Sequence, residues 1–124
     1  MFPVHPRTLK VIEEKGLLLP SHVYTCEPVG YLEMSCLLNR AKFVVTDSGG
    51  LQKEAYWAQL PCVTLREETE WVETTTGNWN QVVGKDWHRI AEFIENRELG
   101  GHDKLLYGGL GASQRVVELL SSAS

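Results

Sequence analysis

Residues 43–55 read FVVTDSGGLQKEA, and this stretch decides the fold class. Its first residues are apolar and β-branched and favour a strand, the glycine pair favours a turn, and the residues that follow favour a helix. In a parallel α/β sheet such a turn lies at the carboxyl end of its strand, where ligands bind. The stretch therefore predicts a strand, a turn and a helix, with a binding site at the glycines.

The same alternation between short β-like runs and longer helical runs recurs along the chain, which predicts an α/β protein built from βα units around a mostly parallel sheet. We expect strands at residues 2–4, 23–26, 43–46, 62–65 and 81–83. We expect helices at residues 7–15, 31–40, 49 to before 61, 87–94 and 112–120, with Asp86 as the N-cap of the fourth.

The last two helices carry apolar residues at i, i+3, i+4 and i+7, or nearly so. A stripe of this kind is typical of core packing. We therefore expect both stripes to be buried: Trp87, Ile90, Ala91 and Ile94 in the first, and Ala112, Val116, Leu119 and Leu120 in the second.

Composition limits the classes of function. The chain has 124 residues, which suits one domain, and a net charge of −4 with basic residues scattered along it. We therefore expect no nucleic-acid partner. No apolar run approaches the about 20 residues that span a bilayer, so we expect no membrane partner and a soluble, cytoplasmic protein. The cysteines and histidines show no paired spacing typical of a zinc site, so we expect reduced cysteines and no metal.

The glycine turn has a possible chemistry of its own. The first amides of a helix have no intrahelical partner and favour an anion, and the hydroxyl of Ser48 could donate a further bond. Glu54 lies one turn beyond Gly50 and could accept both hydroxyls of a ribose. We expect Leu51, Ala55 and Ala58 to be buried and Lys53 to point into solvent. An ordinary tight turn with a surface Glu54 is the alternative, and the spacing by itself favours it.

Longer motifs resemble one family. Residues 47–55 (DSGGLQKEA) and 60–71 (LPCVTLREETEW) are similar to the signature of the non-hydrolysing UDP-N-acetylglucosamine 2-epimerases. Residues 3–8 (PVHPRT) and 80–84 (NQVVG) resemble further motifs of that family. Family members are much longer and have paired Rossmann-like domains in the GT-B arrangement. The resemblance implies that residues 1–124 are a single UDP-binding Rossmann-like domain, the C-terminal half of a GT-B fold, incomplete at its N-terminus.

The resemblance also implies a reaction and a site. In this family the C2 proton of a UDP-sugar is abstracted while UDP is eliminated, and UDP then returns with C2 inverted. By resemblance, Ser48, Gly49 and Gly50 bind the diphosphate and Glu54 the ribose. His5 lies near the phosphates or the reacting sugar and is the catalytic candidate, although the residues alone favour a loop histidine between prolines. We expect no cofactor. The carboxylates credited with the acid and base work belong to the first domain, so we expect no epimerisation by this chain alone.

Two features leave the exact substrate and the partners open. Trp71 replaces a cationic residue of many relatives, a form that resembles the branch acting on UDP-2,3-diacetamido-2,3-dideoxyglucuronate. Alternatives to an epimerase fragment are a GT-B glycosyltransferase domain and a non-catalytic UDP-binding module. The strands near residues 2–4 and 43–46 would lack a shared central neighbour, so we expect either association into a homo-oligomer or direct pairing of those strands. A separate N-terminal domain is the other candidate partner.

Overall fold

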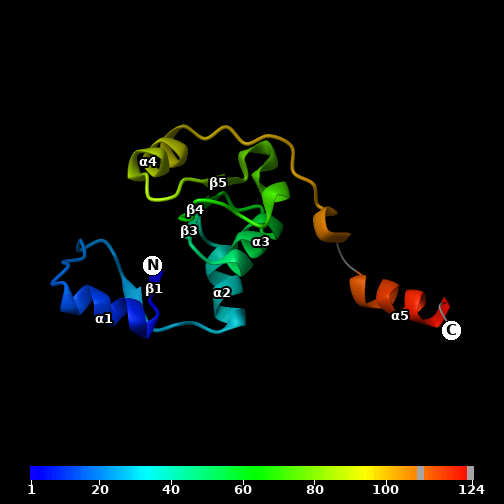
Figure 1. Cartoon of the computed structure of the whole chain (residues 1–124), viewed down its shortest axis with the longest axis horizontal. Helices are drawn as coiled ribbons and strands as arrows, with labels where there is room; N and C mark the ends of the chain where they lie inside the picture. Colours follow the sequence, from blue (N-terminus) through cyan, green and yellow to red (C-terminus); the bar gives the residue numbers. More distant parts are fainter. Residues whose placement is uncertain (109–110, 123–124) are drawn as a thin grey trace. The chain divides into compact units, whose positions relative to one another are not determined.

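The computed structural model of the chain describes residues 1–108 and 111–122. It divides into two compact units, residues 1–37 and 38–124, and each is described by itself. Figure 1 labels the helices and strands. In chain order they are β1 (Phe2–Pro3), α1 (Pro6–Glu14), β2 (Thr25–Cys26), α2 (Tyr31–Leu38), β3 (Val44–Thr46), α3 (Gly49–Trp57), β4 (Cys62–Thr64), η1 (Val72–Asn78), β5 (Asn80–Val82), α4 (Trp87–Asn96), η2 (Leu106–Gly108) and α5 (Ala112–Ser122).

The first unit is a short βαβ arrangement. Strands β1 and β2 are parallel, with Phe2 opposite Thr25, and α1 connects them. Pro6 begins α1, where a missing N–H costs nothing, and His5 caps it through a bond from the Arg7 amide to Nδ1 (3.2 Å). The helix ends before Gly16, whose φ of +59° is readily adopted only by glycine. The expected strand and helix positions in this unit are confirmed.

The second unit is a parallel sheet in the order β3-β4-β5, with Val44 opposite Cys62 and Cys62 opposite Asn80. All three residues of β4 are buried, as expected of a central parallel strand. Val63 packs with Phe93 of α4, whereas the neighbouring Thr64 bonds through Asn80 to α3. Successive strand residues face opposite ways, so α3 and α4 cover opposite faces of this sheet (Figure 1). The predicted fold class, α/β with parallel sheets, is confirmed.

The buried stripe of α4 differs from the predicted one. Phe93 is buried and packs with Val63 and Val83, and Ile90 and Ile94 lie against them. Trp87, predicted to be part of this stripe, is 65% exposed and contacts the His88 ring. It occupies the first helical turn, and the helix begins there at the Asp86 cap, as predicted. The stripe over the sheet therefore starts one turn later than the periodicity suggests.

The expected burial of α5 is wrong for the described chain. Every described residue of this helix is exposed, including Val116 at 54% and Leu119 at 69%. The amphipathic pattern is present, but among the described residues nothing covers the apolar face.

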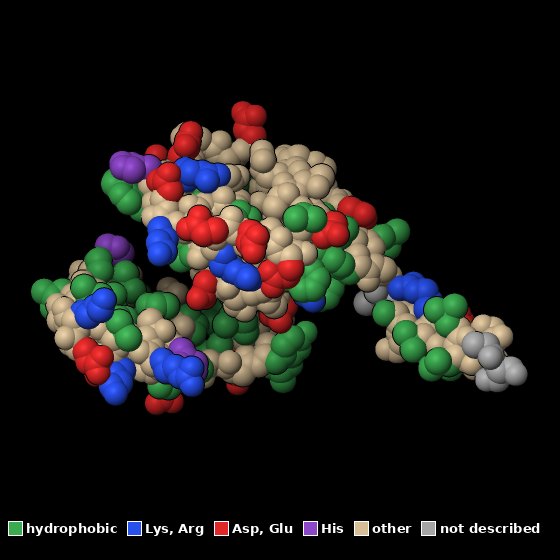
Figure 2. All heavy atoms as spheres, viewed as in Figure 1, with side chains coloured by type: hydrophobic (Ala, Val, Ile, Leu, Met, Phe, Trp, Pro, Cys, Tyr) green, Lys and Arg blue, Asp and Glu red, His purple; other side chains and the backbone are tan. Residues whose placement is uncertain are grey.

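None of the helices in the described part of the chain is long and apolar enough to cross a bilayer. On the face shown in Figure 2, Lys and Arg side chains lie interspersed with Asp and Glu side chains.

Candidate functional site

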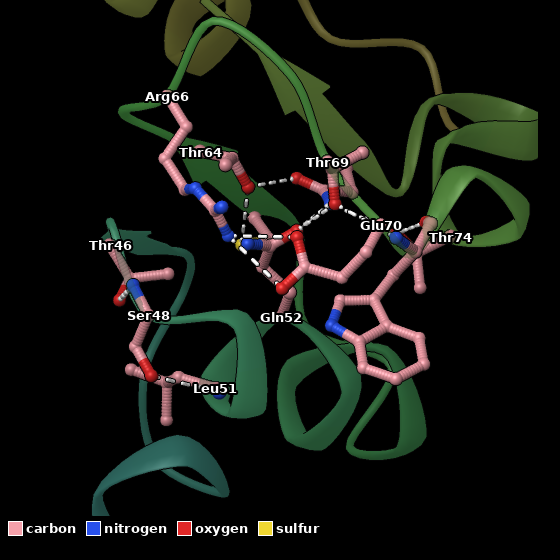
Figure 3. Close-up of polar contacts among 12 residues, drawn as sticks. Thr46, Ser48, Leu51, Gln52, Thr64, Arg66, Thr69, Glu70 and Thr74 are labelled. Atoms are coloured by element: carbon pink, nitrogen blue, oxygen red, sulfur yellow. Dashed lines mark hydrogen bonds and ion pairs between the residues drawn. The ribbon is translucent and has the colours of Figure 1, made fainter. Parts of the chain in front are cut away.

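The N-terminus of α3 is built by a short polar turn after β3 (Figure 3). The Ser48 amide donates to Thr46 Oγ1 (3.0 Å), and Ser48 Oγ accepts from the Leu51 amide (3.4 Å), so Ser48 is the N-cap. Neither the Gly49 amide nor the Gly50 amide donates to an acceptor within the described residues. Two unpaired donors at a helix N-terminus, reinforced by the helix dipole, favour an anion.

The two glycines have different reasons to be glycine. A Cβ on Gly49 would lie 2.6 Å from Glu70 Oε1, so a side chain there would displace this carboxylate. A Cβ on Gly50 would meet only Ser48 Oγ, at 3.9 Å, which is ordinary contact. Neither glycine has a positive φ. Nothing within the described residues therefore requires glycine at position 50, whereas a ligand approaching the backbone would.

Arg66 lies close to this turn and was missed by the sequence analysis. It follows β4, the strand beside β3, and Arg66 Nη1 bonds to Glu70 Oε2 (2.8 Å) and Oε1 (3.1 Å). Glu70 Oε1 in turn lies against Gly49. The signal was available, because parallel strands end at a common sheet edge and β4 was predicted to end just before Arg66. Glu70 is thus an ion-paired carboxylate in the segment that follows β4.

The Glu70 carboxyl has an altered acidity. A bond from its own backbone amide and the bond from Arg66 hold the pKa of Glu70 below its usual range, with further attraction from the Arg66 and Lys53 charges. The prediction that Lys53 points into solvent is wrong. Its Nζ lies 3.9 Å from the centroid of the Trp71 ring, a cation–π contact that keeps the ammonium near the turn.

A buried polar network fastens α3 to the segment carrying Arg66 and Glu70. Gln52 is fully buried, and its Oε1 accepts from Thr69 Oγ1 (2.6 Å) and Asn80 Nδ2 (3.1 Å). Asn80 also accepts from Thr64 Oγ1 (2.6 Å) and donates to Thr74 Oγ1 (2.9 Å). Figure 3 shows the side chains of Gln52, Thr64 and Thr69 lying close together between α3 and the strands. Gln52 takes the buried position where Leu51 and Ala58 were predicted, and those two are half-buried.

The remaining predicted site residues lie in different places. Ser48, Gly49 and Gly50 form the N-terminus of α3, and Glu54 is half-buried one turn further along the same helix. His5 belongs to the first unit, where it is exposed and caps α1. Within the described residues, no three His, Cys, Asp or Glu side chains form a group that could hold a metal ion.

A parallel sheet with a glycine turn leading into a capped helix defines a Rossmann-like α/β protein. The model of the UDP-N-acetylglucosamine 2-epimerase family matches residues 1–121, and the chain belongs to this family. The UDP-2,3-diacetamido-2,3-dideoxy-D-glucuronate 2-epimerase of Pseudomonas aeruginosa is 48% identical in an alignment that covers 98% of this chain and 34% of that protein. A UDP-N-acetylglucosamine 2-epimerase homolog of Methanococcus maripaludis is 45% identical over 97% of this chain and 35% of its own length.

Solved structures give the same result for the fold. The UDP-GlcNAc 2-epimerase of Methanocaldococcus jannaschii, in complex with UDP-GlcNAc and UDP, matches with a TM-score of 0.81 and 33% identity. The match covers 98% of this chain and 35% of that one. The chain therefore spans about a third of the length of the relatives that it matches.

Proposed function

We propose that this chain binds the UDP portion of a UDP-activated 2-acetamido sugar as part of a 2-epimerase. The observation that carries the proposal is the pair of unused Gly49 and Gly50 amides at the start of α3, with the Arg66 guanidinium held beside them through Glu70. Membership of the epimerase family supports it, as does the Methanocaldococcus jannaschii relative solved with UDP-GlcNAc and UDP. Named relatives act on UDP-sugars that carry a 2-acetamido group.

Each residue has a defined part in this proposal. The diphosphate oxygens accept from the two glycine amides, the Ser48 hydroxyl still has its own hydrogen to donate, and Arg66 adds a positive charge. Glu54, one turn along the same helix, offers two carboxylate oxygens to the two hydroxyls of the ribose. The open space beside Gly50 admits the phosphate to the backbone.

The epimerase reaction gives this binding its purpose. Abstraction of the C2 proton accompanies loss of UDP from C1, so the enzyme must retain UDP until it re-adds to the inverted sugar. We propose that this chain holds the leaving diphosphate and that His5 acts near the phosphates. The acid and base carboxylates implied by the family resemblance lie outside this chain. We therefore expect no exchange of the C2 hydrogen when the chain meets UDP-N-acetylglucosamine in deuterated water.

Calorimetry with UDP, uridine and pyrophosphate tests the phosphate site. UDP should bind with a Kd of about 1 mM and more tightly than uridine. Gly50→Ala should weaken the binding of UDP and of pyrophosphate, because the added methyl group would occupy the space where the phosphate approaches the backbone. Gly101→Ala is the matched control, since a Cβ there has nothing within 4 Å and its φ is not positive. Equal affinity for UDP and uridine, or no binding of either, would refute the proposal.

The ribose role of Glu54 needs a separate comparison. Glu54→Ala should weaken UDP while leaving pyrophosphate unchanged, because only UDP carries the diol. Glu95→Ala, on the exposed side of α4, removes the same charge away from α3 and should change neither affinity. A parallel loss of both ligands in Glu54→Ala would show that Glu54 acts through charge or folding and not through the ribose.

A further inference from the structure

The space beside Gly49 contains an anionic side chain of the protein itself. Glu70 Oε1 lies 2.6 Å from the position of a Gly49 Cβ, so this carboxylate rests directly on the first residue of α3. Arg66 Nη1 contacts both of its oxygens, at 2.8 and 3.1 Å. Figure 3 shows the Glu70 and Arg66 side chains directed toward each other above the start of the helix. Arg66 is therefore engaged before any ligand arrives.

The surroundings of this carboxylate favour an anion strongly. Lys53 adds its charge, and the pKa of Glu70 is held below its usual range by its own backbone amide and by Arg66. Trp71 Nε1 would lie 3.3 Å from the same Cβ position. This indole N–H is buried and has no hydrogen-bond partner. The same is true of Nε2 of the fully buried Gln52. Trp71 Nε1 is thus a donor beside Gly49 that the Glu70 carboxylate leaves unsatisfied.

We propose that Glu70 is an internal competitor that occupies the anion site of α3 and must move aside before a diphosphate can bind there. The inference rests on the proposed function and adds a regulatory contact to it. Arg66 bonds to Glu70 through Nη1 alone, so its remaining donors could still reach a phosphate, and the competition is for space: Glu70 Oε1 lies beside Gly49, where a bound phosphate oxygen would have to come. Binding therefore exchanges the Glu70 carboxylate for a phosphate beside Gly49, and Glu70 swings outward on a side chain that is already half exposed.

This exchange predicts that removing the Glu70 charge tightens diphosphate binding. Exposed ion pairs are weak, so Glu70→Gln should bind pyrophosphate about two- to fivefold more tightly than the wild-type chain. Glu68→Gln removes the same charge from the same segment, where the side chain is exposed and makes no contact with the site, and should change the affinity less than about 1.5-fold. Arg66→Gln should weaken pyrophosphate binding, because the positive charge beside the helix N-terminus is then missing.

Calorimetry of pyrophosphate and UDP with these three variants decides the matter. Tighter binding in Glu70→Gln alone supports the inference. Unchanged or weaker binding in Glu70→Gln would show that Glu70 orients Arg66 and does not compete. Equal tightening in Glu68→Gln would show that the effect comes from net charge alone. Either result overturns the inference but leaves the proposed function standing. Failure of the wild-type chain and all variants to bind UDP or pyrophosphate overturns both.

Discussion

The buried polar network makes Thr74 a sensitive position. Thr74 is fully buried, donates through Oγ1 to the Trp71 carbonyl (2.6 Å) and accepts from Asn80 Nδ2 (2.9 Å). Thr74→Val keeps the shape but removes both bonds. At about 1 kcal/mol per bond, the free energy of unfolding should fall by about 2 kcal/mol. The cost stays near that sum because Asn80 Nδ2 keeps its bond to Gln52, and the Trp71 carbonyl keeps the Thr74 amide (3.0 Å).

The adjacent residue provides a matched control. Thr75 Oγ1 donates to the Val72 carbonyl (2.6 Å) at an exposed position, where water can replace the bond, so Thr75→Val should cost about 0.5 kcal/mol or less. Urea unfolding followed by tryptophan fluorescence measures both, since Trp57, Trp71, Trp79 and Trp87 all lie in the second unit. In thermal unfolding the Thr74 variant should melt about 8 °C lower. Equal losses in the two variants would refute the role of the network.

Further predictions concern the cysteines, a helix cap, the Gln52 contact and assembly. Burial raises the pKa of the Cys62 thiol to about 11, so iodoacetamide should modify exposed Cys36 but spare Cys62. Because the folded pKa lies above the ordinary 9.0, the contribution of Cys62 to stability should be lost as pH rises from 9.0 toward 11. A free energy of unfolding that stays constant over this pH range would contradict the prediction. Asp86→Ala removes the cap of α4 and should cost about 1 kcal/mol in urea unfolding, against no change for exposed Asp47→Ala. Gln52 holds Thr69, three residues after Arg66, and should thereby position Arg66. Gln52→Leu should therefore weaken pyrophosphate binding but add nothing to the loss in Arg66→Gln. Additive losses of affinity in this double-mutant cycle would exclude such positioning. We expect a homo-oligomer, and light scattering that gives 14.0 kDa at every dilution would reject it.

Local pattern was enough to place the helices and strands. The expected strands and helices are all present, because short β-branched runs, caps such as Asp86 and stops such as Gly16 act within a few residues of where they stand. Burial was harder to predict, since it depends on what covers a face. Phe93 replaced Trp87 in the α4 stripe, and the apolar residues of α5 have no cover among the described residues.

At the candidate site, too, burial could not be predicted from the local sequence pattern. Periodicity favoured Leu51 as a buried residue of α3, because a glutamine carries polar atoms that cost free energy when buried alone. Gln52 is buried instead because Thr69 and Asn80, 17 and 28 residues away, both donate to its Oε1. Contacts at that separation leave no trace in a periodic pattern. Lys53 was misplaced for a similar reason, since its partner is the ring of Trp71.

The cap of α1 bears on what His5 can contribute to the proposed reaction. The Arg7 amide donates to His5 Nδ1, which must therefore present a lone pair, so the neutral ring carries its hydrogen on Nε2. In that tautomer the free edge of the ring offers an N–H donor and no acceptor. A donor suits a phosphate oxygen, whereas abstraction of the C2 proton needs an unprotonated nitrogen. The capping bond thus favours His5 as a ligand of the departing diphosphate over a general base. In the proposed function, His5 is therefore a hydrogen-bond donor to a phosphate oxygen and not the base that removes the C2 proton.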